Sequence, residues 1–383
     1  MKTQNSLFAI LWIFIFFSCN HTNNKNANAY SLVGSDKYLS FSLNSNTKSD
    51  INALFLYIDD SGKEYLTFQN PSQNEILFYN PNTEKLEFTI RPHVEGNNGV
   101  GFFNGYYIHN LDSIYITNSG LSEFAIIDRN AIVKDKIQYF ESTEGIPLSA
   151  HASTTFLHQP IVVIDNKIYI IPSCNRLEEK NPVCAVIDIM THNVQALLGF
   201  TYPTFPGADN KAKRYGVEGY LSRCFDGKQF VYSFYFDENI YVAPPNHGHV
   251  KLVKVKSNYL KEVKIPDDYG NVTMEKLCEN PNYGNLLYDE YRDVYYRIAY
   301  PETELEKNIR GTELLRYGRK SFSVIIIDKY FNIIGETLLP NYTYNSQVMF
   351  IREDGLYISS SHYLNPKYSD DVLSFQRFDL VKN

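Results

Sequence analysis

A turn followed by an aromatic-aliphatic strand recurs six times along the chain, and this repeat constrains the fold more than any other feature. The turn consists of Asp, Asn, Ser or Gly, as in DNKIYI at residues 165–170 and EDGLYI at residues 353–358. One aromatic residue marks each strand: Tyr65, Tyr115, Tyr169, Phe230, Tyr295 and Tyr357. These residues lie 50, 54, 61, 65 and 62 positions apart. Strand repeats of this length are typical of β-propeller blades.

A second hairpin follows within the units, such as EILFYNPNTEKLEFTI at residues 75–90. Each unit therefore has four strands, named a, b, c and d in chain order. The last unit ends one strand short, and a spare strand precedes the first unit at residues 36–43. We predict an all-β fold, a six-bladed β-propeller of four-stranded antiparallel blades whose ring is closed by the N-terminal strand. A seven-bladed ring and a pair of β-sandwiches are the alternatives, but a sandwich does not explain the regular spacing.

The connections between strands differ in length according to the side of the disc on which they lie. In such a blade the a–b and c–d turns share one side, and the b–c and d–a connections share the other. The second set carries the long insertions, which are residues 91–101, 140–153, 199–220, 264–284 and 301–321. Because extended loops on a rigid scaffold commonly carry binding residues, we expect a ligand to bind on the side with the long connections.

The N-terminal residues differ in chemistry from the rest of the chain. Leu7–Phe17 is an unbroken apolar run of eleven residues. It is too short for a membrane-spanning helix, which needs about 20 residues, and has the length of a signal-peptide core. Ser18 and Cys19 follow, which resembles the lipobox of bacterial lipoproteins, with Phe at the two preceding positions where Leu and Ala or Ser are commoner. An ordinary secretory signal with an incidental cysteine is the alternative.

These observations predict three segments. Residues 1–18 are a lipoprotein signal peptide, residues 19–35 a flexible tether, and residues 36–383 a single propeller domain. The tether is predicted because residues 20–31 are rich in Asn and hold no aliphatic residue larger than alanine. Fatty acyl chains such as palmitate on Cys19 would give stable membrane attachment. Attachment through two or more acyl chains is stable, whereas attachment through one chain is marginal. We expect an outer-membrane lipoprotein of the cell envelope that faces the periplasm, with surface exposure left open.

Composition limits the partners of the chain. The formal net charge is −7, and no basic stripe is present, so nucleic acid is excluded as a partner. The aromatic content of 15%, with 31 Tyr and 25 Phe, favours β structure. Four cysteines follow Cys19, and none has CxxC spacing. Cys174 and Cys184 flank a strand connection, which fits either a disulfide between them or two free thiols. We expect no metal and no cofactor.

Four segments carry a family resemblance: the lipobox, EGNNGVG at residues 95–101, SRCFDGKQFVYSF at residues 222–234, and YDEYRDVYYR at residues 288–297. With these the chain resembles the Bacteroidetes lipoproteins grouped as domain of unknown function 4221. The resemblance covers nearly the whole mature chain. It implies an envelope-anchored propeller, and it implies no known reaction, so no catalytic residue is carried over.

Three residues of the d–a connections are candidates for acid–base chemistry or ligand binding. His93, Glu95 and His151 are expected near the mouth of the central channel. Histidine titrates near neutral pH and a carboxylate beside it can share a proton. Their alternative role is that of polar loop residues that satisfy turns.

Arginine and tyrosine supply the other candidates. Arg176 and Arg223 have the planar donor fork that binds carboxylate, sulfate or phosphate groups, and Arg214 with Tyr215 suits sugar or peptide recognition. Solvated charged loops are the alternative. Arg297 is expected in a structural role between blades.

His192, His247 and His249 fall in short c–d turns and are interpreted as solvated turn residues rather than metal ligands.

Two hypotheses follow. The first, which we favour, is a non-enzymatic lipoprotein that binds a small-molecule, glycan or protein ligand through the long connections. The second is a hydrolase or lyase that acts on glycan or peptide in a polar central funnel. Convergence of His93, Glu95 and His151 within hydrogen-bond reach would favour the second hypothesis.

Overall fold

Strands make up nearly all regular structure in the computed structural model, which describes residues 29–49, 51, 54–118, 122–148, 159–172, 181–203, 220–266 and 272–383. Within these residues the helical segments are α2 (Met274–Glu279), α3 (Gly311–Tyr317) and one 3₁₀ turn at Pro71–Gln73. A helix is predicted from the sequence near residues 302–317, and α3 forms only at the end of that range.

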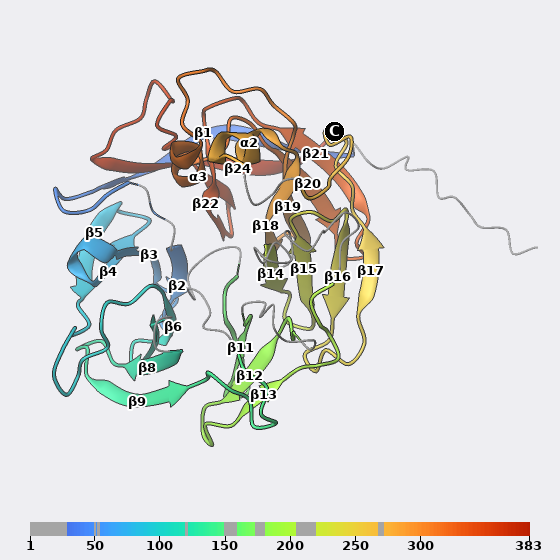
Figure 1. Ribbon diagram of the computed structural model, residues 1–383. Coiled ribbons are helices and arrows are strands. Elements are labelled where there is room, and N and C mark those ends of the chain that lie inside the picture. The colour runs from blue at the N-terminus through green and yellow to red at the C-terminus, as the bar shows by residue number, and fades with distance from the viewer. Residues whose placement is uncertain are drawn as a thin grey trace, which may run out of the picture.

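Four separate four-stranded antiparallel sheets follow one another around a common centre (Figure 1). The first sheet is β2 (Leu54–Ile58), β3 (Glu64–Asn70), β4 (Glu75–Asn80) and β5 (Lys85–Ile90), and the second is β6 (Tyr106–Asn110), β7 (Ser113–Asn118), β8 (Glu123–Ile127) and β9 (Val133–Gln138). The third is β10 (Val162–Ile164), β11 (Lys167–Ile170), β12 (Ala185–Asp188) and β13 (Val194–Ala196), and the fourth is β14 (Leu221–Phe225), β15 (Phe230–Phe234), β16 (Asn239–Ala243) and β17 (Lys251–Lys254).

The other eight strands form one sheet in the order β18-β19-β20-β21-β1-β24-β23-β22. One half is β18 (Asn282–Asp289), β19 (Val294–Tyr300), β20 (Ser323–Asp328) and β21 (Ile333–Leu338). The other half is β22 (Asn345–Arg352), β23 (Gly355–Ser359), β24 (Val372–Lys382) and the N-terminal strand β1 (Tyr30–Ser42). A single parallel pairing, Tyr30 with Gly335, joins the two halves.

The predicted all-β ring of four-stranded antiparallel units is therefore present, but the predicted number of separate sheets is wrong. Four four-stranded sheets and one eight-stranded sheet stand where six equal blades were expected. The physical reason is that β1 has a hydrogen-bonded neighbour on each side. It pairs with β24 along its length and contacts β21 at its first residue.

The N-terminal strand begins earlier than the sequence predicts. β1 starts at Tyr30 rather than residue 36, so residues 30–35 lie in a strand and not in the predicted tether. Its antiparallel pairing with β24 runs from Tyr30 opposite Lys382 to Ser42 opposite Val372, with a bulge between Gly34 and Tyr38. Ten residues of β1 thereby gain partners in β24, and only five of them lie within the predicted strand at residues 36–43.

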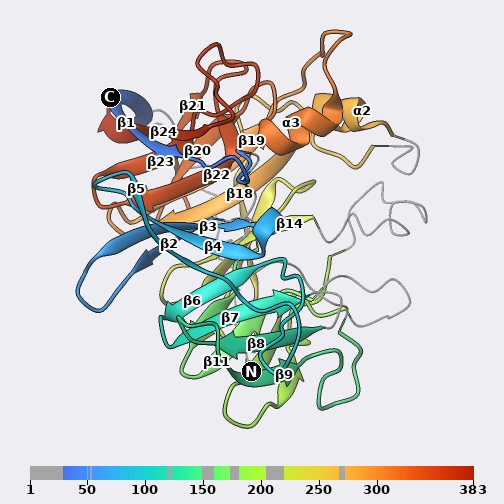
Figure 2. The ribbon, with the colours of Figure 1, turned by 90° about the vertical axis from the view of Figure 1, so that its left-hand side faces the viewer.

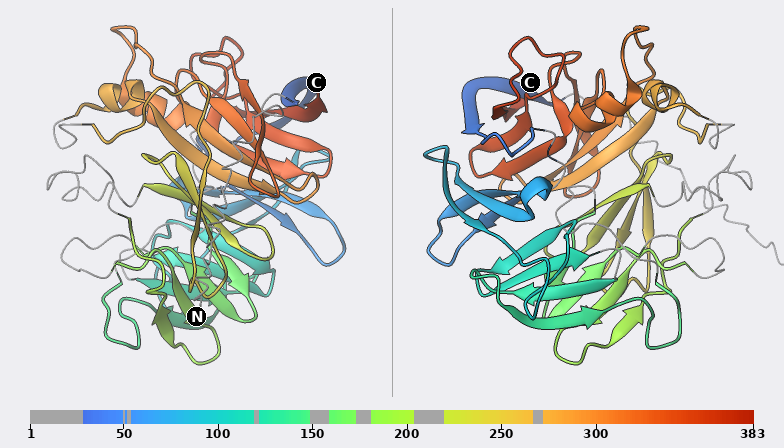
Figure 3. Two further views of the ribbon diagram at one scale, coloured as in Figure 1. Left: turned by 90° about the vertical axis from the view of Figure 1, so that its right-hand side faces the viewer. Right: turned by 60° about the vertical axis from the view of Figure 1, so that its left-hand side comes forward.

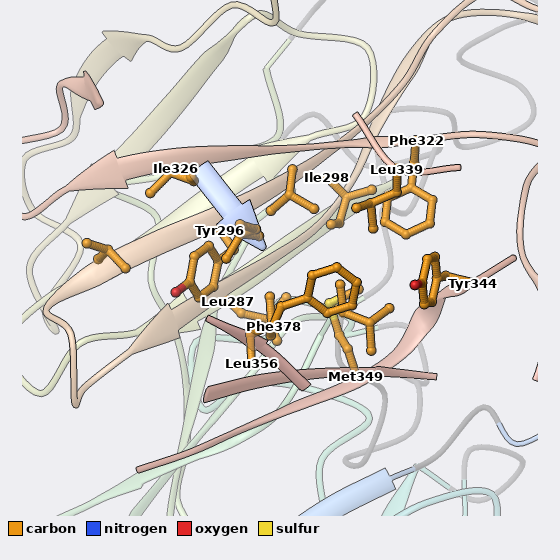
Figure 4. Close-up of a cluster of buried hydrophobic side chains, with 14 of the residues drawn as sticks. Leu287, Tyr296, Ile298, Phe322, Ile326, Leu339, Tyr344, Met349, Leu356 and Phe378 are labelled. Carbon is orange, nitrogen blue, oxygen red and sulfur yellow. The ribbon is translucent and has the colours of Figure 1, made fainter. Parts of the chain in front are cut away.

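Apolar clusters fill the spaces between successive sheets. Figure 4 shows one of them, in which Tyr296 and Ile326 of one half of the eight-stranded sheet face Met349, Leu356 and Phe378 of the other. A middle strand is therefore covered on both faces, and every residue of β19 is buried. This explains why the tyrosine-rich sequence at residues 288–301 does not alternate between polar and apolar residues.

The connections sort onto two faces, as the sequence predicts. The short-turn face carries the a–b and c–d turns, including residues 59–63, 189–193 and 329–332. The long-connection face carries the b–c and d–a connections, among them residues 91–105, 301–322 and 360–371, together with α2 and α3. Figure 2 shows both helices on the side away from β1 and the C-terminus, and Figure 3 shows the same separation from two other directions.

The junction of β1 with β21 depends on a glycine. A Cβ atom at Gly335 would lie 2.0 Å from the backbone oxygen of Tyr30. We predict that Gly335→Ala lowers the free energy of unfolding by about 1–3 kcal/mol, the usual cost of overpacking, and speeds proteolytic cleavage near Tyr30. Urea unfolding and limited proteolysis measure both effects.

The control is Gly248→Ala, where the nearest atom to an added Cβ is an Asn246 side-chain oxygen at 3.5 Å. It should leave both measurements unchanged. Equal behaviour of the two variants would contradict a tight β1–β21 junction.

Candidate functional site

A cavity of about 460 Å³ lies at the centre of the ring. Its lining comes from the first strands of the four four-stranded sheets, β2, β6, β10 and β14, and from β18 and β22 of the eight-stranded sheet. Most of the lining side chains are apolar, and Tyr107, Arg223 and Tyr288 add polar groups. The cavity is of the size of a small-molecule site.

The cavity lies nearer the short-turn face on one side of the ring. β14, β18 and β22 each run from the long-connection face to the short-turn face, and each lines the cavity with its second half: residues 223–225, 286–288 and 350–351. Toward the long-connection face, the Asn285 side-chain amide donates to the Ser346 carbonyl at 3.1 Å and links β18 to β22.

Arg223 is fully buried, although it is a predicted ligand contact. Its guanidinium donates to the Pro160 carbonyl at 2.5 Å and to the Tyr169 carbonyl at 2.9 Å, and it lies over the Phe230 ring at 5.2 Å. These bonds fix β14 to the preceding sheet. The Nε atom has no hydrogen-bond partner. Arg223 lines the cavity, but the contacts that it makes are between sheets.

A buried chain of polar groups continues from Arg223. The guanidinium lies 3.6 Å from the Cys184 sulfur. The Tyr232 hydroxyl donates to Nε2 of His247, whose Nδ1–H donates to the Pro245 carbonyl at 3.0 Å. Burial raises the pKa of the Cys184 thiol and lowers the pKa of His247 to about 4. Both groups are therefore neutral at pH 7, so these buried polar groups supply neither a thiolate nor a charged acid.

These buried polar groups bear on two predictions from the sequence, those for His247 and Cys184. His247 was expected in a solvated turn, and this is wrong: the 244–250 turn folds back so that its imidazole packs on Phe200 and Phe230. Cys184 has a free, buried thiol. Cys174, its predicted disulfide partner, lies outside the described residues.

The other predicted site residues do not form a group in the described part of the chain. His93 and Glu95 are both exposed in the 91–105 connection, and neither side chain makes a hydrogen bond or ion pair there. His151, Arg176, Arg214, Tyr215 and the predicted lipidation site Cys19 lie outside the described residues. The convergence of His151 with His93 and Glu95 stays a prediction.

A cluster of tyrosines on the long-connection face was not anticipated. Tyr317 ends α3, Tyr342 lies in the 339–344 connection, and Tyr363 and Tyr368 lie in the 360–371 connection. The ring centroid of Tyr317 lies 5.6 Å from that of Tyr363 and 5.8 Å from that of Tyr368. All four rings are half-buried. We call these four residues the tyrosine cluster.

Carboxylates hold the hydroxyl groups at the rim of the tyrosine cluster. The Tyr342 hydroxyl donates to Glu306, and Lys320 pairs with the same carboxylate at 3.0 Å. These two hydrogen bonds lower the pKa of Glu306 to about 2. The Tyr368 hydroxyl donates to Asp370 at 2.5 Å. The cluster therefore combines aromatic surface with fixed hydrogen-bonding groups.

A buried histidine supports the tyrosine cluster from below. The His362 ring stacks beside Tyr363, with 5.2 Å between centroids, and lies 5.5 Å from the Tyr342 ring. Its Nε2–H donates to the Gly318 carbonyl at 3.0 Å, and its Nδ1 accepts from the Leu364 amide at 3.1 Å. Both nitrogen atoms are occupied, so His362 joins the 360–371 connection to the end of α3.

The sequence offered a partial signal for this cluster. It places arginine beside tyrosine within residues 305–319, and Tyr317 belongs to the cluster. Nothing in the repeat places this segment beside residues 363–368, because the two segments are irregular connections of neighbouring units.

Arg297, the single charged residue of β19, has the structural role that the sequence predicts. Its guanidinium stacks on the Tyr283 ring at 3.4 Å and donates to the carbonyls of Val255 and Asp237, each at 2.6 Å. Burial lowers its pKa to about 10. The group stays charged at neutral pH and binds the fourth sheet to the eight-stranded one.

Two further features bear on chemistry. The described residues contain no group of three or more His, Cys, Asp or Glu side chains that could hold a metal ion. Among the same residues there is also no helix with the length and apolar character needed to cross a membrane.

Comparison with known proteins shows the family. Residues 29–338 match the family described as Domain of unknown function (DUF4221). The chain belongs to this family.

Solved structures show the same fold. A DUF4221 member from Bacteroides vulgatus is 23% identical, with a TM-score of 0.78 over 93% of this chain and 100% of that chain. A protein of Bacteroides fragilis described as exported is 10% identical, with a TM-score of 0.54 over 93% of this chain and 98% of that chain. The ring of antiparallel sheets is thus common to these proteins, and the family description assigns no reaction.

The two buried histidines predict how stability depends on pH. The pKa values of His247 and His362 are about 4 in the folded protein, against an ordinary 6.5, because burial disfavours the charged ring. The unfolded chain therefore binds more protons as the pH falls from 6.5 toward 4. Each histidine lowers the free energy of unfolding by up to about 1.4 kcal/mol per pH unit in that window.

We expect urea unfolding at pH 5.0 and 7.5 to show a smaller pH difference for His362→Asn than for the unaltered protein. The control is His249→Asn, since His249 is exposed in the folded chain. A pH difference that His362→Asn leaves unchanged would contradict a buried, neutral His362.

Proposed function

We propose that this DUF4221 protein is a non-enzymatic lipoprotein of the cell envelope that binds its ligand on the long-connection face. The tyrosine cluster carries this proposal, because three separate connections bring four half-buried aromatic rings together beside fixed carboxylates. Half-buried tyrosines present apolar ring surface and a polar edge at once. A carbohydrate, which has apolar C–H faces and many hydroxyl groups, is the ligand class that fits this combination.

The scaffold that we infer is a six-bladed propeller. The eight-stranded sheet divides into two four-stranded halves that are joined at one residue pair, Tyr30 with Gly335. Counted in this way, six units surround the central cavity, and each contributes its first strand to the lining. The N-terminal strand β1 then closes the ring as the outermost strand of the last unit.

The envelope location rests on the N-terminus. The signal-like segment and the lipobox-like Cys19 support lipidation. The likeness to a Bacteroides fragilis protein described as exported is consistent with passage out of the cytoplasm. We propose that Cys19 carries the acyl chains and that the outer membrane holds the protein.

Replacement of the acylated cysteine tests the anchor. We expect Cys19→Ala to abolish incorporation of an alkyne-bearing fatty acid and to move the protein from the membrane fraction to the soluble fraction, because no other acyl chain holds it. Cys174→Ala is the control and should keep both properties. Fatty-acid labelling of the Cys19→Ala protein would contradict the proposed anchor.

Replacement of tyrosines tests the binding surface. On a glycan array, we expect saturable binding that weakens about tenfold in Tyr317→Ala and Tyr363→Ala, which corresponds to about 1.4 kcal/mol for one aromatic contact. The control is Tyr330→Ala, because Tyr330 is an exposed tyrosine on the short-turn face. Equal weakening in all three variants would contradict the assigned surface, as would unchanged binding in both cluster variants.

A further inference from the structure

Strand directions place the start of β1 and the C-terminus on the short-turn face. β24 follows the 360–371 connection, so it starts at the long-connection face and ends at the short-turn face. β1 is antiparallel to β24 and therefore begins at the short-turn face, with Tyr30 opposite Lys382. The Asn383 amide donates to the Ala29 carbonyl at 2.8 Å, and the Ser31 hydroxyl bonds the Asn383 side chain at 2.8 Å. Figure 2 shows β1 and the C-terminus on the side opposite α2 and α3.

We infer that the protein sits with its short-turn face toward the lipid bilayer and its long-connection face directed away from it. This inference rests on the proposed lipid anchor at Cys19. The bilayer surface lies against the short-turn face, since the chain enters the fold at that face. The tyrosine cluster, on the opposite face, would then be open to ligands that are not part of the same membrane.

The length of the N-terminal segment sets how firmly the orientation is held. Ten residues, 20–29, separate Cys19 from Tyr30. At ~3.6 Å per residue they reach at most about 40 Å, and an irregular chain of this length spans about 18 Å on average. β18 has eight residues, which gives the ring a thickness of about 26 Å before any connection is added. An inverted molecule would need the segment to pass the whole ring nearly extended.

The short-turn face has side chains suited to shallow contact with headgroups. Met190 and Tyr330 project from two c–d turns with 77% and 72% of their surface exposed. Val33 and Val381 are exposed on the β1–β24 ribbon near the chain ends. Acidic turn residues such as Asp59 and Asp128 lie on the same face. Attraction to anionic lipid therefore does not orient the protein. The orientation comes instead from the short segment between Cys19 and Tyr30.

Energy transfer to the bilayer tests the orientation. The full acylated chain, carrying Cys174→Ser, is reconstituted in phosphatidylethanolamine–phosphatidylglycerol vesicles that contain a headgroup-linked acceptor dye. Cys184, Cys224 and Cys278 are buried, so a donor maleimide reacts at an introduced cysteine. Donor sites on the short-turn face are Met190→Cys and Tyr330→Cys. Matched sites on the long-connection face are Phe102→Cys and Phe140→Cys, exposed by 71% and 56%.

We expect several-fold higher transfer rates from the two short-turn sites than from the two long-connection sites. Insertion of about twelve Gly and Ser residues before Ala29 should reduce that difference, since a longer tether relaxes the orientation. Equal transfer from all four sites, or higher transfer from the Phe102 and Phe140 sites, in vesicle-bound protein overturns the orientation and leaves the anchor intact. Failure of the acylated chain to stay with the vesicles overturns the anchor, and with it this inference.

Discussion

The pairing of β1 with β24 is the interaction on which the rest of the structure depends. It joins residues that are 330 to 352 positions apart, from Ser42 opposite Val372 to Tyr30 opposite Lys382. A ring of sheets has no stable end unless its last unit obtains a fourth strand, because an open edge leaves a row of unpaired backbone groups. β1 supplies a fourth strand to β22, β23 and β24 and also contacts β21, so one segment joins the two halves of the eight-stranded sheet.

Buried arginines and tyrosines make the second set of links between units. Arg223 binds carbonyls of the preceding sheet, and Arg297 binds carbonyls of the sheet before it. A buried cation needs partners because its desolvation is costly, and here backbone carbonyls and ring faces serve in place of carboxylates. These contacts explain why Arg223, which the sequence predicts as a ligand contact, also links neighbouring sheets of the ring.

Position in the repeat decided which sequence predictions succeeded. Arg297 lies in a strand whose neighbours on both sides follow from the periodicity, so its structural role was predictable. His247 lies in a turn, and a short polar turn predicts exposure to solvent. The seven-residue 244–250 turn is long enough to fold back on Phe230, and no local pattern reports that contact. The tyrosine cluster was missed for the same reason, because its members come from three irregular connections.

The sequence by itself determined the all-β ring of four-stranded units and the side on which the long connections lie. Both follow from periodicity and connection length, which are local properties of the chain. Tertiary structure alone decided that β1 begins at Tyr30 and merges two units into one sheet, that His247 is buried, and that Tyr317 meets Tyr363 and Tyr368. These features depend on contacts between segments far apart in sequence, for which the repeat carries no information.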